Sequence, residues 1–194
     1  MAIAKQAQVR VGKLLEASSR WLAYMGGAVL VALALLTVVS VIGRALLAWG
    51  GRPIKGDFEL VEAGCAIAIF AFLPWCQLKR GHVTVDIFIQ TLPARAQAFL
   101  GLVGDLLLAL AAYVILWRLW LSFGEKFPFG GDGLRALLGM GARPFFVETT
   151  YELEMPIWIP YAVSLVGAAM FFIVSLYCVW RALNWVIEGR EERV

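Results

Sequence analysis

The chain has 194 residues, of which 61% are hydrophobic and 16% are charged. Soluble domains are about 45–50% apolar and about 25% charged, so this composition excludes both an ordinary soluble globule and a disordered chain. The net charge of +3 comes from basic and acidic residues scattered along the chain, which argues against a nucleic-acid-binding face.

Four apolar segments are long enough to cross a lipid bilayer, which needs about 20 mostly apolar residues in a helix. These segments span about residues 21–43, 57–79, 95–121 and 157–183. The expected fold is therefore an all-α membrane protein with four transmembrane helices in a single domain over residues 1–194. A long loop over residues 122–156 joins the third and fourth helices.

The N-terminal segment is predicted to be retained and not cleaved as a signal peptide. The charge-free run after Arg20 is too long for the apolar region of a signal peptide, and no A-x-A cleavage site follows it. Residues 9–20 mix basic and apolar side chains at helical spacing, and we expect them to lie on the inner membrane surface. A frayed basic tail is the alternative.

Polar residues near the end of the first helix form a stripe of Thr37, Ser40 and Arg44. We interpret this stripe as ordinary helix packing, with Arg44 extending its charge towards water.

Three acidic residues occupy the first turns of the second helix, where negative charge suits the helix dipole. They are Asp57, Glu59 and Glu62. Two interpretations have equal weight: a solvated helix start, and a contact with a partner protein.

The loop between the second and third helices carries several structural signals. Pro74 removes a backbone hydrogen bond and should kink the second helix, and Gly81 is the expected C-cap. Apolar residues in the range 83–92 share a helical face, which predicts a short amphipathic helix in the inner interface; a lone strand would have no partner there. His82 and Asp86 are spaced for a local hydrogen bond, with a proton relay as the alternative.

Asp105 is the one clear charge within the membrane, because it lies near the middle of the third predicted helix. Such residues are often functional, but Asp105 has no evident basic partner in the sequence and shares a face with Gly101 and Gly104. We therefore favour a structural helix–helix contact over an ion path.

The orientation follows from the connections between helices. Lys and Arg number ten in the two tails and the second loop, against seven in the first and third loops. All eight Trp lie near a predicted helix end, as expected at the level of the lipid headgroups. Both termini are therefore expected in the cytoplasm.

Neither an enzyme nor a cofactor site is expected in this chain. Cys65, Cys76 and Cys178 lie far apart in apolar runs, which is typical of reduced packing residues. The single histidine cannot supply paired haem ligands, and no nucleophile, phosphate-loop or zinc motif is present.

Several short motifs resemble the small membrane subunit of tripartite ATP-independent periplasmic (TRAP) transporters, over about residues 20–183. They comprise Gly56-Asp57-Phe58-Glu59-Leu60, Phe72-Leu73-Pro74 with Gln77, Gly81-His82-Val83-Thr84-Val85-Asp86, Leu92-Pro93, and Tyr151-Glu152-Leu153 with Pro156 and Trp158. The resemblance implies structural or subunit-contact roles for these residues and no substrate site in this chain.

The resemblance further implies a transporter of three parts in the inner membrane of a bacterium. A periplasmic binding protein delivers an organic acid, and a large membrane subunit carries the substrate and sodium sites. The small subunit braces that large subunit. Two alternatives remain open: a stand-alone oligomeric proton-coupled transporter that uses Asp105, and, more weakly, a membrane anchor for a redox enzyme.

Overall fold

The computed structural model describes residues 5–81 and 93–188. Its elements are α1 (Lys5–Ala45), the 3-10 helix η1 (Leu47–Trp49), α2 (Asp57–Leu78), α4 (Ala94–Lys126), α5 (Asp132–Leu138) and α6 (Trp158–Glu188). Within the described residues the only strand-like feature is an isolated bridge between Thr149 and Pro156. The all-α prediction is confirmed, while the expected interfacial helix in the range 83–92 lies outside the described residues.

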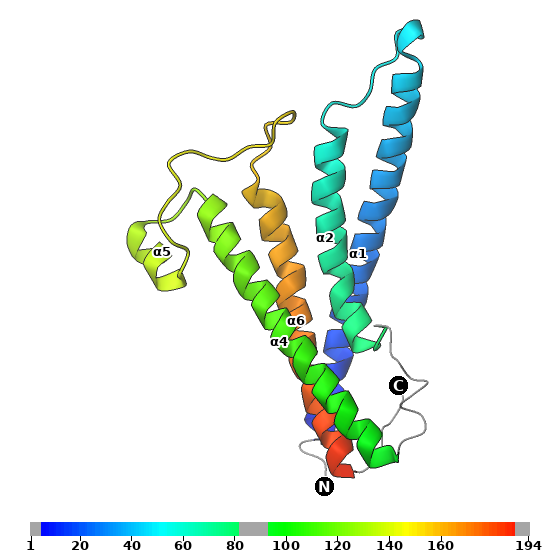
Figure 1. Cartoon of the computed structure of the whole chain (residues 1–194), viewed down its shortest axis with the longest axis vertical. Helices are drawn as coiled ribbons and strands as arrows, with labels where there is room; N and C mark the ends of the chain where they lie inside the picture. Colours follow the sequence, from blue (N-terminus) through cyan, green and yellow to red (C-terminus); the bar gives the residue numbers. More distant parts are fainter. Residues whose placement is uncertain (1–4, 82–92, 189–194) are drawn as a thin grey trace.

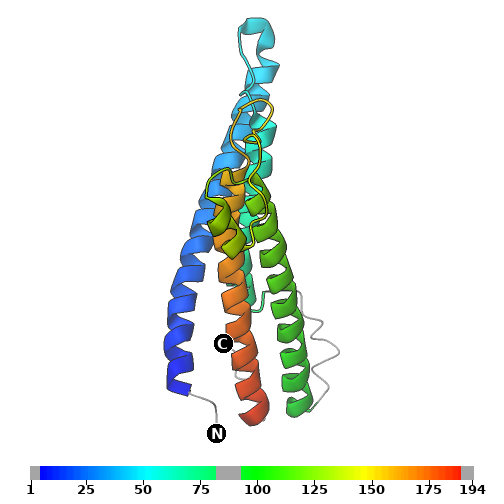
Figure 2. The ribbon, with the colours of Figure 1, turned by 90° about the vertical axis from the view of Figure 1, so that its left-hand side faces the viewer.

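The long helices form two pairs, α1 with α2 and α4 with α6, which are joined by packing of α2 against α6. Figure 1 shows the pairs close together at one end of the molecule and apart at the other. We call the first the terminal end, because α1 begins and α6 finishes there, and the second the loop end. Figure 2 places α6 between α1 and α4 at the terminal end.

In the part of the chain that the structure describes, four helices are long and apolar enough to cross a membrane. Only 11% of the most apolar stretch of α1 is buried within the chain, against 39% for α6. Helix α6 is therefore the central one, and the apolar faces of the others need lipid or another protein to cover them.

Helix α1 is longer than expected. It has 41 residues, or about 60 Å at 1.5 Å per residue, roughly twice the thickness of the hydrocarbon core. We expected residues 9–20 to lie along the membrane surface; instead they continue α1 without a break. No proline interrupts this stretch, and Glu16 pairs with Arg20 one turn later at 3.3 Å.

Close helix packing depends on glycines in α1, α2 and α6. A Cβ atom placed on Gly167 of α6 would lie 2.5 Å from the carbonyl oxygen of Phe70 in α2. A Cβ atom on Gly64 of α2 would lie 2.8 Å from a methyl group of Leu33 in α1. Small residues at these crossings let the backbones approach closely, as in other membrane helix pairs.

The C-terminus of α2 differs from the prediction by one residue. The Gly81 N–H donates to the Cys76 carbonyl at 2.8 Å and the Arg80 N–H donates to the Gln77 carbonyl at 3.2 Å, which is the Schellman pattern. The left-handed position of that motif belongs to Arg80, with a φ of 50°, and not to Gly81. This turn directs the Arg80 side chain back towards α4.

Candidate functional site

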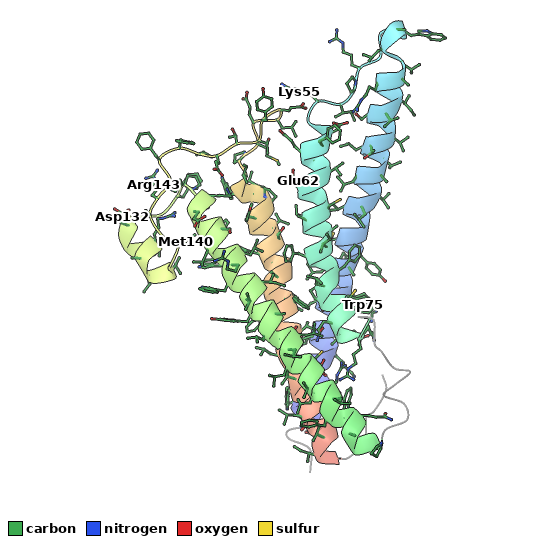
Figure 3. The ribbon with its side chains drawn as sticks, viewed as in Figure 1. Lys55, Glu62, Trp75, Asp132, Met140 and Arg143 are labelled. Atoms are coloured by element: carbon green, nitrogen blue, oxygen red, sulfur yellow. The ribbon has the colours of Figure 1, made fainter. Side chains whose placement is uncertain are left out.

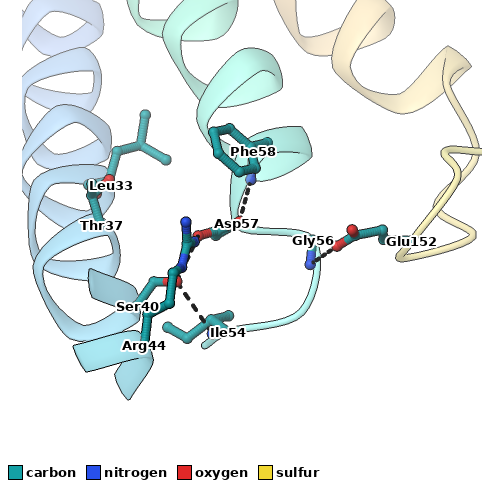
Figure 4. A network of polar contacts seen from close by, with 9 residues as sticks. All are labelled: Leu33, Thr37, Ser40, Arg44, Ile54, Gly56, Asp57, Phe58 and Glu152. Atoms are coloured by element: carbon teal, nitrogen blue, oxygen red, sulfur yellow. Dashed lines mark hydrogen bonds and ion pairs between the residues drawn. The ribbon is translucent and has the colours of Figure 1, made fainter. Parts of the chain in front are cut away.

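At the loop end, Asp57 connects the start of α2 to the last turns of α1. The Ser40 hydroxyl donates to Asp57 Oδ2 at 2.5 Å, and Arg44 Nη2 donates to the same oxygen at 2.8 Å (Figure 4). The Ile54 N–H in turn donates to Ser40 Oγ at 3.3 Å. The Arg44 side chain remains 47% exposed, and it also forms an ion pair within the chain that the sequence did not indicate.

Glu59 and Glu152 join the start of α2 to the segment before α6. Glu152 Oε2 accepts a hydrogen bond from the Gly56 N–H at 2.5 Å (Figure 4). Glu59 accepts from the N–H groups of Glu152 and Leu153 at 2.7 and 3.1 Å. We call these three hydrogen bonds the loop-end latch. Its carboxylates bind backbone within the chain, a contact that neither interpretation of Glu59 had included, while Glu59 does lie in the first turn of α2.

Gly56 has a φ of 71°, and a Cβ atom there would lie 2.3 Å from Leu153 Cγ. Glycine is favoured at this position both by the left-handed backbone and by the close approach of Leu153.

The segment that carries Glu152 is a tight hairpin over residues 149–156. The Thr150 N–H donates to the Met155 carbonyl at 2.9 Å, and the Met155 N–H donates back to Thr150 Oγ1 at 3.1 Å. Pro156 closes the bridge to Thr149, and Trp158 then begins α6, as the sequence indicated for this helix start. The second half of the long loop is thus ordered by its own hydrogen bonds.

A cavity of about 540 Å³ lies between the two helix pairs, beneath this hairpin. Its lining includes Glu59 and Glu62 from α2 and Tyr161 and Ser164 from α6. Figure 3 shows Glu62 on α2. Among the described residues that line the cavity there is no Lys, Arg or His, so its charge disfavours an organic anion.

At the terminal end, Asp105 has a basic partner that the sequence did not reveal. Arg80 Nη2 lies 2.8 Å from Asp105 Oδ2, and Gln77 Nε2 makes a long contact of 3.5 Å to the other carboxylate oxygen. The Asp105 side chain is only 6% exposed. This ion pair supports the structural interpretation of Asp105 and occupies the carboxylate that a proton-coupled transporter would require.

Aromatic and basic side chains surround this ion pair. The guanidinium carbons of Arg80 and Arg181 lie 4.7 and 5.1 Å from the centre of the Trp185 ring, within cation–π range. Arg181 Nη2 also donates to the Leu78 carbonyl, the last of α2, at 3.2 Å. Helix α6 therefore holds the C-terminus of α2 through side chains, and the buried Cys178 packs in the same contact as a free thiol.

The structure groups the motif residues into two places. Gly56, Asp57, Glu59 and Glu152 meet at the loop end, and Gln77 lies beside Asp105 at the terminal end. Of the other motif residues, Leu73 and the buried Pro74 lie inside α2, Pro93 lies directly before α4, Gly81 lies in the turn after α2, and Pro156 and Trp158 lie at the start of α6. His82, Val83, Val85 and Asp86 lie outside the described residues.

The role of Arg135 was not predicted from the sequence. There it was included only in the count of basic residues in the third loop. Its side chain is buried at 1% exposure and donates to six backbone carbonyls at 2.5–3.2 Å. These carbonyls belong to Gly124, Phe127, Phe129, Met140, Gly141 and Ala142. We call this arrangement the Arg135 cage. It joins the segment before α5 to the segment after α5.

Over the described part of the chain, no group of three or more His, Cys, Asp or Glu side chains could hold a metal ion. A family model described as "Tripartite ATP-independent periplasmic transporters, DctQ component" matches residues 33–184. No curated protein and no solved structure matches the chain. The family match covers most of the chain and agrees with the resemblance noted from the motifs.

Proposed function

The chain belongs to the DctQ family, a membrane component of TRAP transporters, and from this premise we propose that it braces the large membrane subunit of a sodium-coupled organic acid uptake system. In this role the chain contributes helices and loop contacts, while substrate and sodium bind to the large subunit. A periplasmic protein delivers the organic acid. The family is a transporter-component family, and we propose that the chain has no enzymatic activity or cofactor of its own.

The family match carries this proposal, and the polar groups of the chain support it. A path for an organic anion needs basic or hydrogen-bond-donating groups along its length. The loop-end cavity is instead lined by Glu59 and Glu62, and Asp105 is held by Arg80. Two helix pairs fixed at both ends suit a static support better than a moving carrier.

The exposed apolar surface supports a partner-dependent role. Helix α1 alone exposes many large apolar side chains along its length, among them Tyr24, Val31 and Leu35. We propose that part of this surface contacts the large subunit and the remainder contacts lipid. We propose that both termini lie in the cytoplasm of a bacterial cell, which the excess of basic residues in the tails and the second loop supports.

Reconstitution tests the proposal. The chain is purified alone and together with the large membrane protein that co-purifies with it, and each sample is placed in liposomes. With a sodium gradient and the periplasmic binding protein, we expect uptake of an organic acid only in vesicles that contain both membrane proteins. Uptake by the chain alone, driven by a proton gradient and lost in Asp105→Asn, would establish the stand-alone transporter instead.

A further inference from the structure

Helix α5 folds back beside the loop end of α4. The chain leaves α4 at Lys126, yet Trp120 Nε1 donates to the carbonyl of Leu138, the last residue of α5, at 2.9 Å. Trp120 lies six residues before the end of α4, or about 9 Å along the helix axis. Figure 1 shows α5 at the edge of the molecule, beyond α4. The C-terminus of α5 therefore lies level with Trp120, close to residue 121, where the third apolar segment was predicted to end at the lipid headgroups.

The backbone around α5 satisfies its own hydrogen bonds. The Arg135 cage supplies donors to five carbonyls in the irregular segments on either side of the helix and to the Gly124 carbonyl in the last turn of α4. At the C-terminus the Met140 N–H donates to the Arg135 carbonyl at 3.0 Å, and Gly139 takes the left-handed conformation. Carbonyls in contact with water need no such donors, whereas carbonyls at membrane depth must be satisfied by the protein.

The outward face of α5 is apolar. Leu134, Leu137 and Leu138 are 56%, 82% and 43% exposed. The charged residues of α5 are Asp132, at its first position, and Arg135, which points into the cage. Figure 3 shows Asp132 and Met140 on the two sides of the short helix. An exposed leucine surface of this kind would be unfavourable in water.

The apolar face of α5 lies near a face of α4 that is also exposed. Leu110, Val114 and Trp117 of α4 are exposed, and their spacing places them on the side of the helix that carries Trp120. Trp120 in turn holds the end of α5. This exposed side of α4 thus ends at Trp120, which binds the C-terminus of α5, with the exposed Arg118 beside it.

We propose that α5 is a wedge inserted at the boundary between the headgroups and the acyl chains of the membrane leaflet at the loop end, with Leu134, Leu137 and Leu138 in contact with lipid. The proposal requires the transmembrane topology of the proposed function but not its transport activity. Lipid is the occupant that the observations favour. The bond to Trp120 puts α5 at the level of the lipid headgroups, α5 carries no outward charge after Asp132, and the carbonyls around it are satisfied within the chain.

Fluorescence quenching tests the wedge in the full-length chain, both alone and in its complex with the large subunit. Cys65, Cys76 and Cys178 are replaced by alanine, and one new cysteine carries a polarity-sensitive fluorophore. The tested site is Leu137→Cys, with Leu134→Cys as a second site on the same face. Tyr151→Cys, 94% exposed at the hairpin, is the aqueous control, and Val114→Cys on α4 is the lipid control.

In phosphatidylcholine vesicles with brominated acyl chains, we expect quenching at Leu137→Cys to exceed quenching at Tyr151→Cys by about twofold or more and to approach that at Val114→Cys. Iodide in the buffer should show the reverse order. Strong iodide quenching at both α5 sites would place α5 in water and overturn the wedge. Loss of both kinds of quenching in the complex would identify a protein as the occupant and also overturn it. If Val114→Cys itself escapes the brominated lipid, the transmembrane topology fails, and the wedge fails with it.

Discussion

The two ends of the molecule hold the helix pairs together by different means. At the terminal end, most of these contacts join two side chains: Arg80 pairs with the buried Asp105, and Arg80 and Arg181 both contact the Trp185 ring, although Arg181 also donates to the Leu78 carbonyl. At the loop end, the carboxylates of Glu59 and Glu152 bind backbone N–H groups in a more exposed setting. The comparison shows that contacts at the terminal end depend mainly on which side chains are present. Contacts at the loop end depend mainly on where the backbone N–H groups lie. Substitutions should therefore have unequal effects at the two ends.

The largest expected effect comes from breaking the ion pair at the terminal end. Arg80→Met leaves the Asp105 carboxylate buried without its partner, and we expect a loss of about 3–5 kcal/mol in the free energy of unfolding. Unfolding of the purified chain in mixed detergent micelles measures this loss. The double variant Arg80→Met, Asp105→Leu should recover most of it; a double variant as unstable as Arg80→Met would contradict the role assigned to the pair.

A milder substitution of the same ion pair tests whether Asp105 acts in transport or only in the stability of the chain. Asp105→Asn keeps a hydrogen-bonding side chain beside Arg80, so we expect a loss of about 1 kcal/mol and an assembled complex that retains uptake. Uptake by the reconstituted complex is the measurement, and co-purification with the large subunit is the control for assembly. Complete loss of uptake in a normally assembled complex would give Asp105 a direct part in transport.

At the loop end, Gly56→Ala should separate the hairpin from α2. The φ of 71° disfavours alanine by about 1–2 kcal/mol, and the new Cβ atom would force Leu153 to move. We expect faster amide hydrogen exchange in residues 150–155 with little change at the terminal end. The matched control is Gly27→Ala in α1, where no atom lies within 4 Å of the new Cβ. Unchanged exchange in the hairpin would show that Gly56 does not govern this contact.

The smallest effect should follow from Glu59→Gln, which weakens the loop-end latch without removing it. The amide oxygen can still accept one hydrogen bond from the hairpin backbone, but it lacks the charge that strengthens both bonds. Hydrogen exchange at Glu152 and Leu153 should rise modestly. Glu62→Gln is the control, because Glu62 lies one turn further along α2 and makes no hydrogen bond to the described part of the chain. Equal effects of the two substitutions would mean that the latch contributes nothing.

Hydropathy was sufficient to predict the four long helices and the all-α class, because a bilayer requires long apolar segments. It did not predict where α1 begins, since Lys5–Arg20 is amphipathic and only its continuity with the apolar stretch makes it part of one helix. The position of the helix C-cap was missed by one residue, because Gly81 is the usual choice for a left-handed turn and Arg80 adopts it instead.

The polar contacts were harder to predict than the helices. Arg80 and Asp105 are 25 residues apart, and their pairing depends on the turn geometry after α2. The latch and the Arg135 cage use backbone N–H and carbonyl groups, which every residue except proline offers alike. The sequence therefore identifies Glu59 and Arg135 as charged residues, but it does not indicate which backbone groups they bind.

The loop-end latch has a geometric consequence for the whole molecule. Its hairpin is continuous with α6, whereas its carboxylate Glu59 and its donor Gly56 belong to the start of α2, so three hydrogen bonds connect the two helix pairs where they are furthest apart. Lengthening or shortening that short segment of chain would change the angle between two otherwise rigid halves. The separation of the two helix pairs at this end thus depends on a short hairpin outside the long helices and on the first turn of α2.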